Sequence, residues 1–164
     1  MNEDLRATAT AVLDACRARG LKVATAESCT GGLVAGALTE IAGSSDVVDR
    51  GFVTYSNEAK QQMLGVPAET LRAHGAVSRQ TAEAMARGAL AHSAADIAVA
   101  ITGIAGPGGG SAEKPVGLVH FAAASGRGAL VHREQRYGDL GRAEVRRRSV
   151  LQALTMLKAM AEKI

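Results

Sequence analysis

A serine lies at the junction of a predicted strand and a predicted helix, where a nucleophile is exposed and rigidly positioned. Ser28 follows the apolar run at 21–26 and precedes two glycines, after which apolar residues recur at helical spacing. Backbone N–H groups at such a helix start can bind a negative charge, as an oxyanion hole or a phosphate cradle does. Ser28 is therefore a candidate nucleophile, with the N–H groups of Thr30, Gly31 and Gly32 as candidate anion donors.

The same residues also have structural interpretations. A serine before a helix is more often an N-cap, whose hydroxyl accepts a hydrogen bond from the first helical turn. Cys29 is an alternative nucleophile, although a small residue on the inner side of a helix start is more often packed and inert. Residue types alone leave these interpretations open.

A serine nucleophile needs a base, and the sequence offers few. Its histidines are scattered without a motif, at His74, His92, His120 and His132. Lysine acts as a base only when burial or a neighbouring cation lowers its pKa. Lys60 follows the predicted strand at 47–55, although composition alone favours a surface lysine there. Tyr55 ends that strand and either hydrogen-bonds Ser28 and Lys60, relaying a proton, or packs its ring in the core.

A glycine-rich segment at 102–110 is predicted to be a loop that approaches a ligand with bare backbone. Thr102, Gly103 and Gly106 are its candidate contacts, and nearby Lys114 adds positive charge. The segment matches neither the dinucleotide-binding nor the nucleoside-triphosphate pattern. Acidic residues show no metal-ligand spacing, so we predict no catalytic metal and no cofactor.

The elements that position these residues follow from hydrophobic periodicity. Helices are predicted at 3–19, from 33 to about 43, and at 57–64, 68–74, 78–92 and 141–162, with strands at 21–26, 47–55, 96–101, 116–124 and 129–136. This pattern predicts one α/β domain over 1–164, with three α/β/α layers, a mixed, mostly parallel sheet and an antiparallel C-terminal hairpin. Ser28, Tyr55 and Gly103 all follow strands, so their loops are expected to converge where ligands bind such sheets.

Composition narrows the class of protein. Apolar residues make up 47% and charged residues 21% of 164, as in an ordinary folded domain. With two Phe, two Tyr and no Trp, the chain lacks aromatic surfaces for stacking bases, which argues against nucleic-acid binding. Two cysteines, a polar amino terminus and no long apolar window favour the cytoplasm and argue against a membrane span.

Positive charge is concentrated near the C-terminus. The segment 127–148 has seven arginines and three acidic residues, although the net charge of the chain is only +3. Such a segment suits a phosphate-bearing partner, but it is also typical of a solvated helix face. Small residues and the long basic helix suggest a homodimer.

Several motifs in one order resemble the CinA C-terminal domain family, including its stand-alone PncC-type nicotinamide-nucleotide amidohydrolases. The resemblance begins near Leu5, reaches the last helix, and includes TAESCTGG at 25–32, GFVTYSNEAK at 51–60, GAVS at 75–78, TGIAGP at 102–107 and KPVG at 114–117. It implies that Ser28, Tyr55 and Lys60 form the active site. The motif positions implied to contact substrate are Thr30, Gly31, Gly32, Asn57, Thr102, Gly103, Gly106 and Lys114.

The resemblance implies deamidation of nicotinamide mononucleotide to nicotinic acid mononucleotide and ammonia, in pyridine nucleotide salvage. The serine would attack the carboxamide carbon, with the lysine as base directly or through the tyrosine. Two alternatives stay open. One is a non-catalytic nucleotide-binding or regulatory module associated with competence and DNA-damage proteins, and the other is a hydrolase of a different pyridine or nucleoside amide.

Overall fold

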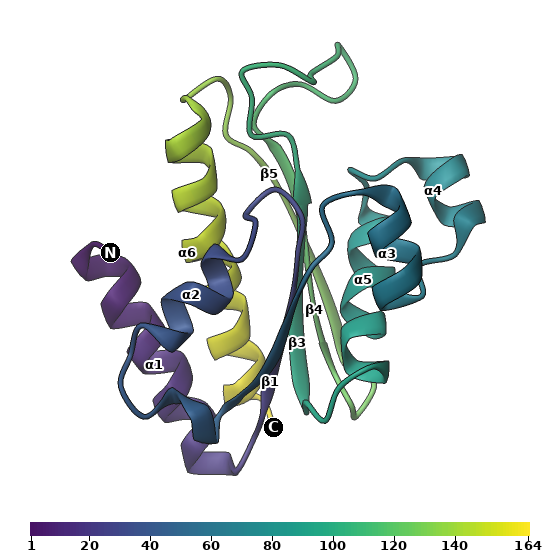
Figure 1. Ribbon diagram of the computed structural model, residues 1–164. Helices are drawn as coiled ribbons and strands as arrows, with labels where there is room; N and C mark the ends of the chain where they lie inside the picture. The colour runs from purple at the N-terminus through teal and green to yellow at the C-terminus, as the bar shows by residue number, and fades with distance from the viewer.

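The computed structural model covers residues 1–164 and shows a five-stranded sheet with helices on both faces (Figure 1). Its elements are α1 (Glu3–Arg19), β1 (Val23–Glu27), α2 (Leu33–Thr39), the 3-10 helix η1 (Ser44–Asp46), β2 (Val48–Val53), α3 (Asn57–Leu64), α4 (Ala68–His74), α5 (Arg79–Ala91), β3 (Ile97–Gly103), β4 (Leu118–Ser125), β5 (Leu130–Arg136) and α6 (Arg142–Glu162). None of these helices combines the length and the apolar character needed to cross a membrane.

The sheet is mixed, with strand order β2-β1-β3-β4-β5. β1 pairs in parallel with β2 and β3, whereas β4 pairs antiparallel with β3 and β5. The predicted α/β fold, its mixed sheet and its antiparallel C-terminal hairpin are confirmed. Because β1, β2 and β3 run in the same direction, their carboxyl ends meet at one edge of the sheet.

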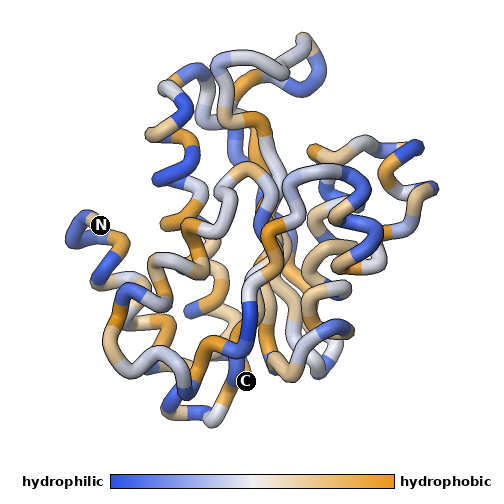
Figure 2. Tube along the Cα trace, viewed as in Figure 1, coloured by the Kyte–Doolittle hydropathy of each residue, from blue (hydrophilic) through white to orange (hydrophobic).

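The two faces of the sheet differ in side-chain size. Larger apolar residues such as Val99, Ile101 and Phe121 pack on the side of α1, α2 and α6. On the side of α5, the buried apolar positions of β1, β3 and β4 are all alanine: Ala24, Ala26, Ala98, Ala100, Ala122 and Ala124. Alternating side chains along a strand produce this division, and the small alanines let α5 approach the sheet closely. Figure 2 shows the apolar colouring of the central strands.

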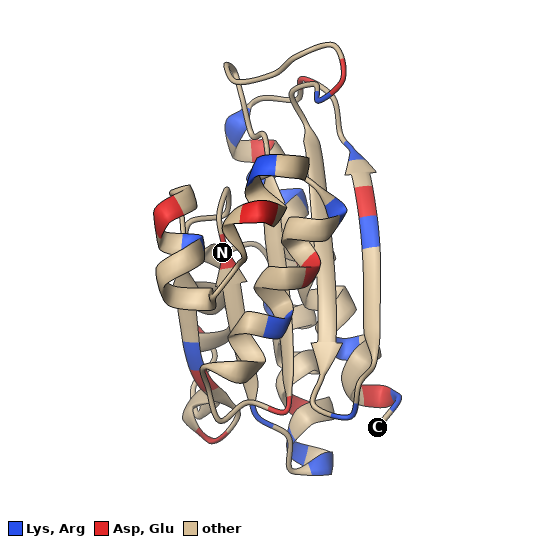
Figure 3. Cartoon of the chain, turned by 90° about the vertical axis from the view of Figure 1, so that its right-hand side faces the viewer, with Lys and Arg blue, Asp and Glu red and all other residues tan.

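The outer strand β5 carries charged side chains along an edge of the sheet. It carries Arg133, Glu134 and Arg136 on an edge that has no further strand beside it. Figure 3 shows these alternating charges along β5, whereas its neighbour β4 carries none. Charged side chains on an edge strand disfavour pairing with another chain.

Several predicted element boundaries differ from the structure: β2 ends at Val53 and not at Tyr55, and β4 covers Leu118–Ser125 where 116–124 was predicted. α2 ends at Thr39 and is followed by η1, whereas a helix to about Gly43 was predicted. β1 starts at Val23, later than predicted, and continues to Glu27. Thr102 and Gly103, predicted to lie in the loop, belong to β3 because they pair with His120 and Val119 of β4.

A single glycine decides how closely α3 approaches α5. A Cβ at Gly88 would overlap the carbonyl oxygen of Leu64 and lie 2.9 Å from its carbonyl carbon. Gly88→Ala is therefore expected to lower the free energy of unfolding by about 1–3 kcal/mol, as overpacking does. Gly36→Ala is the matched control, because a Cβ at this helical glycine meets nothing within 4 Å. Urea unfolding would show the control unchanged or stabilised; a Gly88→Ala protein as stable as wild type contradicts the packing argument.

Candidate active site

A cavity of about 270 Å³ lies at the carboxyl ends of β1, β2 and β3. This edge of the sheet is toward the top of Figure 1. The predicted convergence of three loops is present, and α6 adds a fourth wall. The lining residues are Ser28, Cys29, Tyr55, Lys60, Ala76, Val77, Arg142 and residues 102–106, 108 and 109.

Ser28 and Lys60 are in direct contact within this cavity. The Nζ of Lys60 lies 3.1 Å from the Oγ of Ser28, although 32 residues separate them in the chain. The same Nζ donates to the carbonyl oxygens of Thr54 at 2.9 Å and Tyr55 at 3.3 Å. The lysine is thus directed into the site from α3, whose start is capped by Ser56 accepting a hydrogen bond from the N–H of Ala59.

Burial changes the acid–base behaviour of this lysine. Lys60 is only 1% exposed and makes no ion pair within 4.0 Å with a carboxylate. Because the charged form loses its hydration, burial lowers the pKa of Lys60 below its ordinary value. A neutral amine in this position has two N–H groups for the two carbonyl oxygens and a lone pair for the Ser28 hydroxyl proton. The surface lysine that composition favoured is not what the structure shows.

The turn that carries Ser28 is fixed by a buried carboxylate. Glu27 is fully buried and accepts hydrogen bonds from the N–H groups of Val34 at 2.9 Å and Ala35 at 3.0 Å, and from the Thr30 hydroxyl at 2.6 Å. It therefore occupies the amino end of α2, where a negative charge is favourable. Ser28 is not the N-cap: Gly32 holds that position without a side-chain bond, so the Ser28 hydroxyl remains available.

Only some of the predicted anion donors remain free. The N–H of Gly31 donates to the Ser28 carbonyl oxygen at 2.9 Å, which closes the turn. The N–H groups of Cys29 and Thr30 donate to no backbone carbonyl. Thr30, Gly31 and Gly32 do not line the cavity, whereas Cys29 does. The N–H donors predicted at residues 30–32 are therefore not at the cavity, and the available donor there is the N–H of Cys29, next to Ser28.

Cys29 is poorly suited to act as the nucleophile. It is 5% exposed, and burial raises the pKa of its thiol to about 12. A thiol with this pKa stays protonated near neutral pH, and the thiolate is the nucleophilic form.

Tyr55 does not connect Ser28 and Lys60. Its side chain is 59% exposed, and its hydroxyl accepts a hydrogen bond from the Nη2 of Arg142 at 2.9 Å. Only the carbonyl oxygen of Tyr55 reaches Lys60. A proton relay through the Tyr55 hydroxyl is therefore not the arrangement in this structure, and the lysine contacts the serine directly.

Of the other residues predicted to contact substrate, three line the cavity and two do not. Thr102, Gly103 and Gly106 line the cavity, and the Thr102 hydroxyl donates to the carbonyl oxygen of Ala76 at 2.8 Å. Asn57 is exposed on α3 and Lys114 donates to the carbonyl oxygen of His74 at 2.7 Å; neither lines the cavity. These two side chains are therefore not brought to Ser28.

The four histidines lie outside the cavity around Ser28. None lines the cavity. The Nδ1 of His120 and the Nε2 of His132 are 2.9 Å apart on β4 and β5, and burial lowers the pKa of both rings. No group of three or more His, Cys, Asp or Glu side chains is arranged to hold a metal ion.

Sequence reasoning did not single out three residues that matter here. Arg142 lines the cavity, and Arg146 donates to the carbonyl oxygens of Cys29 at 3.1 Å and Thr30 at 3.4 Å. Both belong to the basic segment predicted to suit a phosphate, but spacing alone does not select them. Glu27 had a usable signal, because an acidic residue just before a predicted helix start favours an N-terminal capping role.

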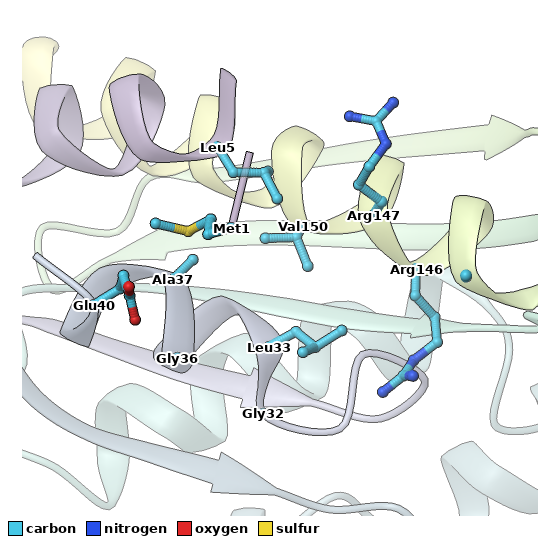
Figure 4. Close-up of a pocket in the computed structure, with 11 residues that line it drawn as sticks. Met1, Leu5, Gly32, Leu33, Gly36, Ala37, Glu40, Arg146, Arg147 and Val150 are labelled. Carbon is cyan, nitrogen blue, oxygen red and sulfur yellow. The ribbon is translucent and has the colours of Figure 1, made fainter. Parts of the chain in front are cut away.

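A larger cavity of about 500 Å³ lies between α1, α2 and α6 (Figure 4). Its walls include Leu5, Leu33, Val150 and the stem of Arg146, whose guanidinium points away toward the turn before α2. It contains neither Ser28 nor Lys60. Size therefore does not identify the chemical site here; the serine–lysine contact does.

Known proteins are similar to this chain over most of its length. A family profile described as the CinA C-terminal domain matches residues 5–161. The nicotinamide-nucleotide amidohydrolase PncC of Escherichia coli strain K12 is 58% identical over 144 residues, which are 87% of this chain and 86% of that protein. A CinA-like protein of a Synechococcus species is 52% identical over 92% of this chain, but the match spans 36% of that longer protein.

A solved structure agrees with the fold throughout. The competence/damage inducible protein CihA from Agrobacterium tumefaciens superimposes with a TM-score of 0.96 at 62% sequence identity, covering 98% of this chain and 97% of that one. The resemblance found in the motifs is therefore confirmed by whole-chain comparison. This chain belongs to the CinA C-terminal domain family.

Proposed function

We propose that this protein is an amidohydrolase that converts nicotinamide mononucleotide to nicotinic acid mononucleotide and ammonia. The observation that carries the proposal is the buried Lys60 amine 3.1 Å from the Ser28 hydroxyl, in a cavity at the carboxyl ends of the parallel strands. The substrate is taken from the similarity to the PncC amidohydrolase of E. coli, at 58% identity. A serine hydroxyl activated by an adjacent base can hydrolyse an amide through an acyl-enzyme, and the neutral amine of Lys60 can act as that base.

The first half of the proposed reaction forms the acyl-enzyme. The neutral Lys60 amine accepts the Ser28 proton while Oγ attacks the carboxamide carbon, giving a tetrahedral intermediate. The Lys60 ammonium then returns the proton to the amide nitrogen, the C–N bond breaks, and ammonia leaves. Lys60 is neutral again and accepts a proton from the water that attacks the ester. It passes this proton to the Ser28 Oγ as the ester bond breaks, which regenerates Ser28 and releases the acid product.

The oxyanion of the intermediate needs N–H donors. The N–H of Cys29 supports this role, because Cys29 follows the nucleophile, lines the cavity and donates its N–H to no backbone carbonyl. Each such donor contributes about 3 kcal/mol of transition-state stabilisation in comparable sites. We assign Tyr55 a positioning role at the mouth of the cavity, where its hydroxyl meets Arg142.

Further parts of the proposal concern context. We propose that residues 1–164 act as one domain, in the cytoplasm, in pyridine nucleotide salvage. We also propose a homodimer, supported by the exposure of the apolar side chains of Leu33 (44%) and Val53 (46%). Light scattering during gel filtration tests the dimer: a mass equal to one chain of 16.8 kDa contradicts it.

The activity is tested by ammonia release from nicotinamide mononucleotide in the presence of a chelator. We expect turnover that the chelator does not affect, with nicotinic acid mononucleotide as the product identified by mass spectrometry. Binding of the nucleotide without ammonia release is the result expected of a non-catalytic module, and it would refute the hydrolase. Release from nicotinamide or its riboside in preference to the mononucleotide would instead change the substrate.

A further inference from the structure

The cavity around Ser28 has an uneven charge. Its fourteen lining residues include two basic side chains, Lys60 and Arg142, and no aspartate or glutamate. Lys60 is buried and its pKa is lowered by that burial, which favours the neutral form. Arginine stays protonated at any pH at which proteins fold. Arg142 therefore supplies the fixed positive charge of the cavity.

Arg142 has no carboxylate partner. It is the first residue of α6, and it donates from Nη1 to the carbonyl oxygen of Gly106 and from Nη2 to the hydroxyl of Tyr55, both at 2.9 Å. The acidic residue in the same helical turn, Glu144, is paired with Arg147 at 2.8 Å and Arg148 at 2.9 Å. Two of the five guanidinium N–H groups are thus used by neutral acceptors, and the remaining donors and the charge are uncompensated.

The geometry of these two contacts fixes the guanidinium across the cavity mouth. Gly106 belongs to the segment after β3 and Tyr55 to the segment after β2, so Arg142 connects three walls of the site. Gly141, the N-cap of α6, offers no side chain to the helix start, and the helix dipole adds positive potential there. A planar guanidinium held in this way is suited to paired hydrogen bonds with phosphate oxygens.

The other cations near the site are committed elsewhere. The Arg146 guanidinium is turned to the carbonyl oxygens of Cys29 and Thr30 and lines the larger neighbouring cavity. Lys114 donates to the carbonyl oxygen of His74 and lines a different cavity, together with Glu113 and Glu134. Of Arg142, Arg146 and Lys114, Arg142 is the one in the same cavity as Ser28 and Lys60.

We propose that Arg142 binds the phosphate of the substrate and thereby makes the enzyme select phosphorylated amides over their unphosphorylated nucleosides. The proposal rests on the amidohydrolase function and adds the group that decides its substrate. A pyridinium nucleoside is cationic, and the cavity has no carboxylate to attract it. The phosphate reverses the net charge of the ligand, so Arg142 attracts the mononucleotide and not the riboside.

The test compares the mononucleotide with the riboside in Arg142→Gln. The variant removes the charge and keeps a side chain that can donate to Gly106. We expect kcat/KM for the mononucleotide to fall about 10- to 100-fold, chiefly through KM, as when a charged hydrogen-bond partner is lost. Riboside turnover is expected to change less than about threefold, so the selectivity ratio collapses. Arg127→Gln, in the β4–β5 turn at the opposite end of the sheet, is the matched charge control and should retain the wild-type ratio.

Three further results separate the explanations. Equal losses on both substrates would overturn the proposal, because Arg142 would then act on catalysis in general. Tyr55→Phe keeps the guanidinium and its contact with Gly106, so it should lose less of the selectivity than Arg142→Gln; an equal loss would assign the effect to the hydroxyl contact and overturn the proposal. If wild type releases no ammonia at all, the proposed function fails, and calorimetry still decides: wild type should bind the mononucleotide more tightly than the riboside, and Arg142→Gln should lose that difference.

Discussion

Ser28→Ala is expected to reduce kcat for ammonia release by about 10⁴-fold or more, the scale of losing a serine nucleophile. The substitution removes one oxygen from a side chain that is 9% exposed, and Lys60 keeps its contacts with the carbonyl oxygens of Thr54 and Tyr55. The fold should therefore persist. Steady-state ammonia release, with circular dichroism to check folding, measures the effect.

The matched control for the nucleophile is the adjacent residue. Cys29→Ala also removes one heavy atom from a small buried side chain, but its thiol has a pKa of about 12 and stays protonated. Activity within a few-fold of wild type is expected. An inactive Cys29→Ala protein beside an active Ser28→Ala protein would transfer the nucleophile to the thiol.

Lys60→Met is expected to lower kcat/KM by about 10³-fold, within the range that a positioned general base contributes. Methionine preserves the length and apolar stem of the side chain but cannot accept the Ser28 proton. Lys22→Met is the control, since Lys22 is exposed and lies at the start of the β1 region, away from the cavity. A Lys60→Met enzyme that retains more than a tenth of wild-type activity would rule out Lys60 as the base.

The kcat/KM of the wild type is expected to change with pH in one direction. Only neutral Lys60 accepts a proton, so kcat/KM should rise with pH through the native pKa of this lysine, which burial lowers. The residual activity of Lys60→Met should lack that limb. A wild-type profile that falls as pH rises over this range would contradict the assignment.

The free energy of unfolding should also depend on the protonation of Lys60. The native pKa of Lys60 lies below the unfolded value of about 10.4, so between the two the unfolded chain binds more protons. The free energy of unfolding should therefore rise with pH across this window, relative to Lys60→Met. Below the native pKa the folded protein bears the full cost of the buried charge. Chemical denaturation at several pH values measures the difference between the two proteins.

Local sequence determined most of the secondary structure. The helices α3 and α4 begin and end where periodicity and the glycine and proline between them predict, at 57–64 and 68–74. The error at the end of β3 arose where long-range pairing decides the boundary. Thr102 and Gly103 are strand residues because β4 pairs with them. Position 103 favours glycine, because a Cβ there would lie 2.7 Å from the Cγ2 of Val119.

For the site, the sequence by itself determined which residue types are available and that Ser28 and Tyr55 come just after strands. Only the tertiary structure decided that Lys60 is buried against Ser28, that the Tyr55 hydroxyl faces Arg142, and that Glu27 occupies the start of α2. The physical reason is that pKa and hydrogen-bond availability depend on desolvation and on neighbours from distant segments. Arg142 and Tyr55 are 87 residues apart in the chain, and their contact exists because α6 and β2 reach the same edge of one sheet.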